Sequence, residues 1–160
     1  MTPEEKINLI EKFNNASGDF DYTLKLNNEI IHFRPFEDAW TIIEQLIHCV
    51  DFETANFHRY RWAISVPGTK VLSFDGNIWK EALKYMNADM AQAISLIKAV
   101  RYFMSTHLRQ IVNEDWTKYI YAFSESKSFN LESALKNWAD HTGFHKELID
   151  RNIKLFSEQK

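Results

Sequence analysis

Residues 90–111 read MAQAISLIKAVRYFMSTHLRQI, and their apolar side chains recur at intervals of three and four positions. This spacing places the apolar side chains on one face and predicts an amphipathic helix, with Asn87 as its N-cap. Arg101 interrupts that face, so it is either a surface residue or a polar group inside a pocket. The apolar positions are Met90, Ile94, Ile97, Met104, Leu108 and Ile111.

Three further segments have helical patterns. Thr2-Pro3-Glu4-Glu5 is typical of a capping box and predicts that a helix begins near the N-terminus. A second helix is expected from about residue 39 to about residue 64, with Asp38 as its N-cap, and it ends before Pro67-Gly68. The last helix is expected from about residue 131 to about residue 156. Between them, residues 113–130 are rich in Ser, Asp and Asn and predict a loop.

Residues 20–34 allow two interpretations. Apolar residues alternate there as in a strand, and Asn27-Asn28 would then form a hairpin turn. The same residues also continue the helical spacing that precedes them. We favour a helix, because an isolated hairpin has no sheet to join. Four long amphipathic segments without a sheet then predict an all-α four-helix bundle, formed by a single domain over residues 1–160.

Composition narrows the class of protein. Lys and Arg number 19 and Asp and Glu number 22, so the formal net charge is 19 − 22 = −3. Nucleic-acid-binding domains usually carry a basic surplus, and we therefore expect no nucleic-acid partner. No apolar run approaches the roughly 18 residues of a membrane span, and the first residues lack a signal-peptide pattern. We expect a cytoplasmic protein with a small-molecule substrate and no membrane partner.

Two histidines, His141 and His145, stand four positions apart in the last predicted helix. Four residues turn about 40° around a helix, so both imidazoles project from one face, one turn apart. That spacing suits two nitrogen ligands of a metal ion, although the same short pattern is common on ordinary helix surfaces. His48, in the helix expected over residues 39–64, offers a third imidazole.

The neighbours of His48 suggest further roles. Glu44 and Asp51 lie about one turn on either side of it, and we expect them to orient a ligand imidazole or to act as a general base. The alternative for Asp51 is a solvated carboxylate or an ion pair. Arg59, on the same side of the helix, is a candidate to clamp an anionic substrate; the alternative is a surface arginine near the helix end. Tryptophans in such a bundle are more often core residues, and the alternative for Trp79 and Trp138 is that they form walls of the pocket.

Residues 40–51, WTIIEQLIHCVD, resemble the signature of the DinB/YfiT-like superfamily of metal-binding four-helix bundles. In that family a Trp-Ser/Thr-Ile opening leads to a histidine two turns later and an aspartate three residues further on. Arg59 stands where the YfiT-like branch also carries an arginine. The other motifs that occur in the family's order are Phe33-Arg34-Pro35, Phe74-Asp75, Trp79 and the pair His141 and His145.

The resemblance implies that His48, His141 and His145 are the three ligands of a divalent metal ion, with zinc or nickel favoured. It also implies a metal-dependent hydrolase or a transferase that uses a low-molecular-weight thiol such as bacillithiol. A non-catalytic metal-binding or stress-response protein is the alternative. Many members of the family pair as homodimers, and the high apolar fraction agrees with a homodimer here.

Overall fold

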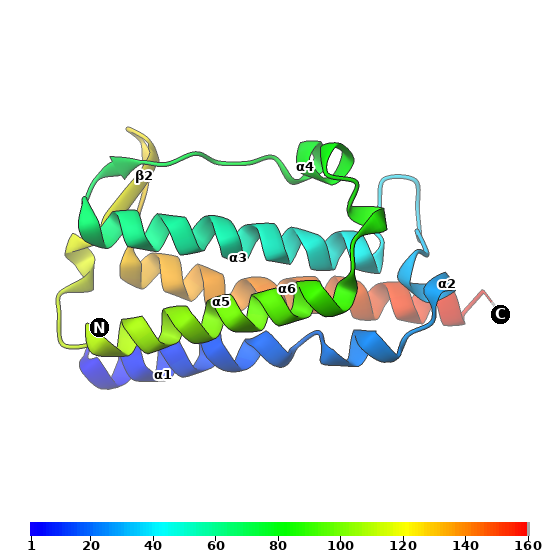
Figure 1. Ribbon diagram of the computed structural model, residues 1–160, viewed down its shortest axis with the longest axis horizontal. Helices are drawn as coiled ribbons and strands as arrows, with labels where there is room; N and C mark the ends of the chain where they lie inside the picture. Colours follow the sequence, from blue (N-terminus) through cyan, green and yellow to red (C-terminus); the bar gives the residue numbers. More distant parts are fainter. Residues whose placement is uncertain (160) are drawn as a thin grey trace.

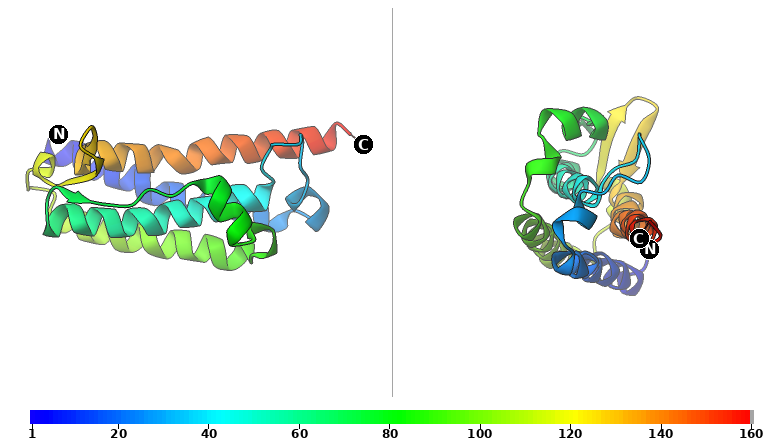
Figure 2. Two further views of the ribbon diagram at one scale, coloured as in Figure 1. Left: turned by 90° about the horizontal axis from the view of Figure 1, so that it is seen from above. Right: turned by 90° about the vertical axis from the view of Figure 1, so that its right-hand side faces the viewer.

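The computed structural model describes residues 1–159. Four long helices lie side by side and form the bundle: α1 (Pro3–Asn15), α3 (Ile42–Ser65), α5 (Met90–Gln110) and α6 (Leu131–Ser157) (Figures 1 and 2). Each of α1 and α3 packs against both α5 and α6. The predicted four-helix bundle is therefore confirmed, and α3 and α6 are neighbours in it.

Reciprocal hydrogen bonds at the helix starts explain where the helices begin. The capping box predicted at Thr2 and Glu5 is present. Helix α3 begins three residues later than expected, because its N-cap is Thr41 and not Asp38. The Thr41 hydroxyl accepts the Glu44 N–H and the Glu44 carboxylate accepts the Thr41 N–H, so two backbone donors are satisfied at once. Helix α5 is capped by Asp89, two residues after the expected Asn87.

The segment after α1 is helical but not continuous. It consists of the 3₁₀ turns η1 (Ala16–Gly18) and η2 (Asp21–Lys25), followed by the short helix α2 (Asn28–Ile31). Leu26 and Asn27 have extended backbones, and the Asn27 side chain accepts the Ile30 N–H to start α2. A continuous helix was thus the wrong expectation, and so was the hairpin. Two successive extended residues interrupt the helix.

A small sheet stands at the opposite end of the bundle from α2 (Figure 1). Its strands are β1 (Thr69–Lys70), β2 (Ile120–Ser124) and β3 (Lys127–Asn130), in the order β1-β2-β3. Strand β2 pairs in parallel with β1 and antiparallel with β3. The prediction of a plain loop over residues 113–130 is wrong, because the aromatic side chains there pack together. Tyr121 is buried and stacks against both Phe129 and Trp138.

Three shorter elements complete the chain: α4 (Gly76–Ala82), η3 (Tyr85–Asn87) and η4 (Trp116–Lys118). The segment between β1 and α4 runs back along α3 (Figures 1 and 2). Within residues 1–159, no helix has the length and apolar character needed to cross a membrane.

Arg101 lies neither on the surface nor in a pocket, but in the core. It is fully buried and donates from Nε and Nη2 to Oε1 of Glu53, at 2.9 and 2.5 Å. It also donates to the backbone carbonyls of Phe13 and Trp138. One guanidinium therefore connects α5 to α3, α1 and α6, which explains why a charge interrupts the apolar stripe.

Candidate metal centre

Three histidines from two neighbouring helices converge. His48 projects from α3 and His141 and His145 project from α6, and one ligand nitrogen of each lies within 4.8 Å of the other two. The ring centroids are 4.9 Å apart for His48 and His145, and 4.5 Å apart for His141 and His145. The four-residue spacing stacks the α6 pair on one face, and the packing of α3 against α6 brings the third imidazole to it.

Burial keeps the three imidazoles neutral. Desolvation lowers the pKa of His48 to about 4. Desolvation, followed by the influence of the neighbouring histidines, lowers the pKa of His141 to about 2 and that of His145 to about 3. The neutral imidazole is the form that coordinates a metal ion, so these side chains are ready to bind one at neutral pH.

Two of the ring nitrogens are enclosed without a partner. Nδ1 of His48 and Nδ1 of His141 are buried and make no hydrogen bond. Leaving a buried polar atom unpaired costs about 1–3 kcal/mol. A site that gathers three neutral imidazoles and leaves buried nitrogens unpaired fits a divalent metal ion, because nitrogen ligands of this kind suit zinc and nickel alike.

His145 has an orienting partner that the sequence analysis did not identify. Nδ1 of His145 lies 2.5 Å from Oε1 of Gln45, and both side chains are buried. Because the amide oxygen can only accept, Nδ1 carries the proton and Nε2 is left as the ligand atom. Phe52 fixes the other histidine of α6, His141, because the two rings stack at a centroid distance of 3.5 Å with an interplanar angle of 6°.

Gln45 and Phe52 were missed because they lie on the opposite flank of His48 from Glu44 and Asp51. At about 100° per residue, Gln45 and Phe52 lie about 60° and 40° from His48 on one side, and Glu44 and Asp51 lie about as far on the other. The contacts of Gln45 and Phe52 show that their flank faces α6. Both were visible in the sequence, but nothing in it indicated which flank packs against the histidine pair.

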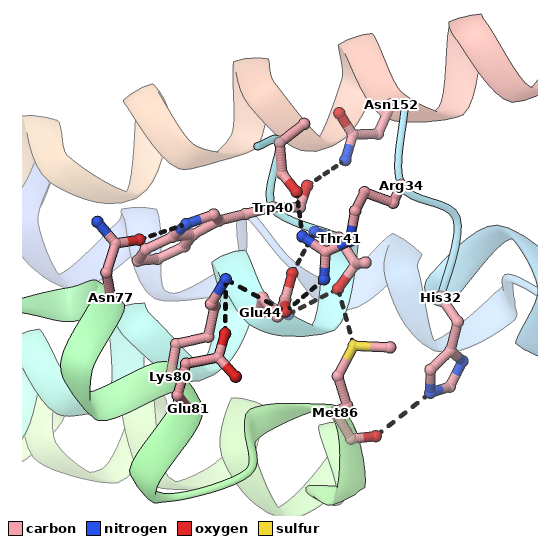
Figure 3. A network of polar contacts seen from close by, with 11 residues as sticks. His32, Arg34, Trp40, Thr41, Glu44, Asn77, Lys80, Glu81, Met86 and Asn152 are labelled. Atoms are coloured by element: carbon pink, nitrogen blue, oxygen red, sulfur yellow. Dashed lines mark hydrogen bonds and ion pairs between the residues drawn. The ribbon is translucent and has the colours of Figure 1, made fainter. Parts of the chain in front are cut away.

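Glu44 serves the loop before α3. Its carboxylate closes the capping box, accepts a hydrogen bond from Arg34 at 2.8 Å and lies 3.9 Å from Nζ of Lys80 (Figure 3). The hydrogen bonds of Thr41 and Arg34 outweigh the effect of burial and lower the pKa of Glu44 below its ordinary value. This carboxylate orients no imidazole of the cluster.

Asp51 is held by a tyrosine on η3. The Tyr85 hydroxyl donates to Oδ2 of Asp51. Burial raises the pKa of Asp51, and the tyrosine hydrogen bond opposes the shift. Asp51 is thus a half-buried carboxylate that forms no ion pair within residues 1–159, and its hydrogen bond is to η3 and not to a histidine.

Arg59 ties α3 to the segment that leads to α4. Its side chain is buried, and its two terminal nitrogens donate to Oδ1 of Asn56 and to the carbonyl of Leu72, each at 2.9 Å. The guanidinium carbon lies 4.9 Å from the ring centroid of Phe123 and 5.9 Å from that of Phe74. Arg59 lines a cleft of about 460 Å³ that does not include the three histidines.

Aromatic side chains cover His48. The ring of Trp40 lies 5.1 Å from it and that of Phe74 lies 5.7 Å from it, and Trp79 stacks on Phe74 at 4.5 Å. Trp79 therefore lies behind the Phe74 ring that covers His48, whereas Trp138 belongs to the core beside Tyr121. The indole N–H of Trp40 donates to Oδ1 of Asn77 at 3.0 Å and fixes the cover (Figure 3).

A cavity of about 300 Å³ adjoins the histidines. Its lining comes from the loop before α3, from α3 and from α6. The lining residues are Asp38, Trp40, Gln45, His48, His145, Leu148 and Arg151. An external ligand can therefore reach two of the three imidazoles.

Four packed helices with three histidines that could hold a metal ion define a class of protein, the helical bundle with a histidine centre. This chain belongs to the DinB superfamily, whose sequence model matches residues 19–149. The resemblance inferred from residues 40–51 is thereby confirmed.

A solved structure has the same fold. It is YfiT from Bacillus subtilis, described as a probable metal-dependent hydrolase with an unusual four-helix bundle topology. The match has a TM-score of 0.89 and covers 98% of this chain and 90% of that one, at 15% sequence identity. At this identity the similarity shows the fold alone. No curated protein matches this chain.

Proposed function

We propose that the protein is a metal-dependent hydrolase of a small molecule. The observation that carries this proposal is the convergence of three neutral imidazoles beside a cavity of about 300 Å³. His48, His141 and His145 would hold a divalent ion such as zinc or nickel, and this ion would supply Lewis-acid chemistry to a water molecule or a thiol. The description of YfiT as a probable metal-dependent hydrolase supports the same reaction class.

The surrounding residues prepare the site. Gln45 holds the proton of His145 on Nδ1, and Phe52 fixes the plane of the His141 ring. Trp40 and Phe74 pack against the His48 ring, and the partial burial of this imidazole keeps it neutral. Glu44 and Asp51 act through structure, because their carboxylates fix the loop before α3 and η3 around the helix that carries His48.

Within residues 1–159, no carboxylate or cysteine joins the three histidines in the cluster. A site with three protein ligands leaves a position for an exogenous ligand, which is typical of a catalytic centre. This favours an enzyme over the non-catalytic alternative, in which protein groups would close the coordination sphere. The same open position would accept a thiol, so a thiol S-transferase is the second candidate that the resemblance of residues 40–51 supports.

The test begins with metal content. Purified protein, stripped and reloaded with zinc or nickel, should hold close to one ion per chain by elemental analysis. His48→Ala, His141→Ala and His145→Ala should each lower occupancy strongly, and His58→Ala, an exposed histidine on the same helix as His48, should not. Full occupancy in all three variants would eliminate the site.

Activity then separates the reaction classes. The loaded protein is assayed on a panel of esters, amides and electrophilic alkyl halides, with and without bacillithiol. Metal-dependent turnover that ignores the thiol supports the hydrolase. Turnover that requires the thiol supports the transferase, and metal binding without turnover on the panel supports the non-catalytic alternative.

A further inference from the structure

Arg151 lines the same cavity as two of the histidines. It lies on α6, six residues beyond His145, and shares the lining with His48, Trp40 and Leu148. The acidic residue of this lining is Asp38, which is exposed and forms no ion pair with Arg151 in the described part of the chain. A guanidinium and two imidazoles therefore line the same small cavity.

The charge of Arg151 is held in place but not neutralised. Nη2 donates to Oδ1 of Asn152 at 3.1 Å, and the guanidinium carbon lies 5.4 Å from the ring centroid of Phe36. Asn152 in turn donates to the carbonyl of Trp40 at 2.7 Å, which fixes the cavity wall (Figure 3). Nε is buried without a partner, and no carboxylate of residues 1–159 lies within ion-pair distance of the guanidinium.

Two of the other arginines near the centre are paired with a carboxylate, and the third has both terminal nitrogens hydrogen-bonded to uncharged groups. Arg34 is paired with Glu44 and Arg101 with Glu53. Arg59 spends both terminal nitrogens on Asn56 and Leu72 and lines a different cleft. Arg151 is thus the cavity-lining arginine whose charge is left for an external anion.

We propose that Arg151 binds the carboxylate of a small substrate whose reacting end lies against the histidine centre. The part of this inference that concerns the reaction rests on the proposed function. The binding of the carboxylate depends only on Arg151 and the cavity. A guanidinium favours a planar carboxylate, because its parallel N–H groups match the two oxygens. The cavity is at the small end of the range for ligand pockets, and Trp40 and Leu148 give it apolar walls. The substrate class is therefore a small carboxylic acid with an apolar or aromatic body.

The test compares benzoate with benzamide, which has nearly the same shape but no charge. Binding is measured by calorimetry on the metal-free protein, so that a metal ion cannot hold the carboxylate itself. Benzoate should bind about 10- to 100-fold more tightly than benzamide, the difference that a hydrogen-bonded charge typically makes. Arg151→Gln should abolish this preference, and Arg151→Lys should retain part of it.

Two controls make the result decisive. Arg109→Gln, which removes an exposed arginine of α5, should leave the preference unchanged. Asp38→Asn should tighten benzoate binding, because it removes the like charge from the cavity wall. Amide NMR spectra check that each variant is folded. Equal binding of benzoate and benzamide by folded wild-type protein would overturn the proposal, and so would a preference that survives Arg151→Gln.

Metal content is measured on the same variants. Arg151→Gln should hold as much zinc as wild type, because Arg151 touches none of the three imidazoles in the hydrogen bonds and ring contacts of the structure. Failure of zinc to bind would count against the proposed function and leave the benzoate result standing. Absence of a benzoate preference in wild-type protein that does bind zinc would count against the role of Arg151 alone.

Discussion

Gly76 is the position where a single methyl group should disturb the histidine centre most directly. A Cβ added there would lie 2.8 Å from Cη2 of Trp40 and 3.0 Å from Nδ1 of His48. Carbon atoms pack at about 3.5–4.0 Å, so the first contact is short by about 0.7 Å or more. Trp40 cannot easily withdraw, because its indole is held by Asn77 and its carbonyl by Asn152.

The expected cost of Gly76→Ala follows from this crowding. Forcing an extra methyl group into a packed site typically costs about 1–3 kcal/mol. If the crowding is relieved by displacing His48, that free energy is lost from metal binding and lowers the affinity by about 5- to 150-fold. Zinc affinity is measured by competition with a chelator, and the free energy of unfolding of the metal-free protein by urea denaturation.

Gly143→Ala is the matched control. Gly143 lies in α6 between His141 and His145, yet a Cβ there would meet nothing within 4 Å. Replacing a helical glycine with alanine should stabilise the protein by up to about 1 kcal/mol and leave zinc affinity unchanged. Normal zinc affinity in a folded Gly76→Ala variant would refute the argument that the α4 segment holds His48 in place by contact.

Four further predictions concern the site, its acidity, the core and assembly. Gln45→Leu should weaken zinc binding about 10- to 100-fold by releasing the His145 ring, whereas Gln45→Glu should retain most of it. Because burial lowers the pKa of the three histidines to about 4, 2 and 3, the unfolded chain takes up more protons below pH 6.5. The free energy of unfolding of the metal-free protein should therefore fall from about pH 6.5 towards pH 4; a flat profile in urea denaturation would contradict this. Glu53→Gln should cost about 3–5 kcal/mol by leaving Arg101 without its buried counter-charge, as thermal or urea unfolding would show. Finally, we propose a homodimer; light scattering should give twice the 18.9 kDa of one chain, and a monomer at micromolar concentration would exclude it.

Local sequence patterns predicted an element correctly where the interactions that form it lie within one segment of the chain. The spacing of apolar residues indicated the four long helices, and the capping box at Thr2 marked the first of them. The sheet was not predicted because its strands come from both sides of α5 in the sequence: β1 follows α3, and β2 and β3 precede α6. Each is too short to be distinguished from a loop before it meets its partners.

The sequence by itself determined that His141 and His145 share one face, because the angle between two residues of one helix depends only on their separation. It also determined that His48 lies on a polar side of α3. Only the tertiary structure decided which flank of that side meets α6, and it selected Gln45 and Phe52 over Glu44 and Asp51. The rotation of one helix against another is set by the packing of all its neighbours, and no residue spacing within α3 records it. For the same reason the buried role of Arg101 became visible only when the other three helices were placed around it.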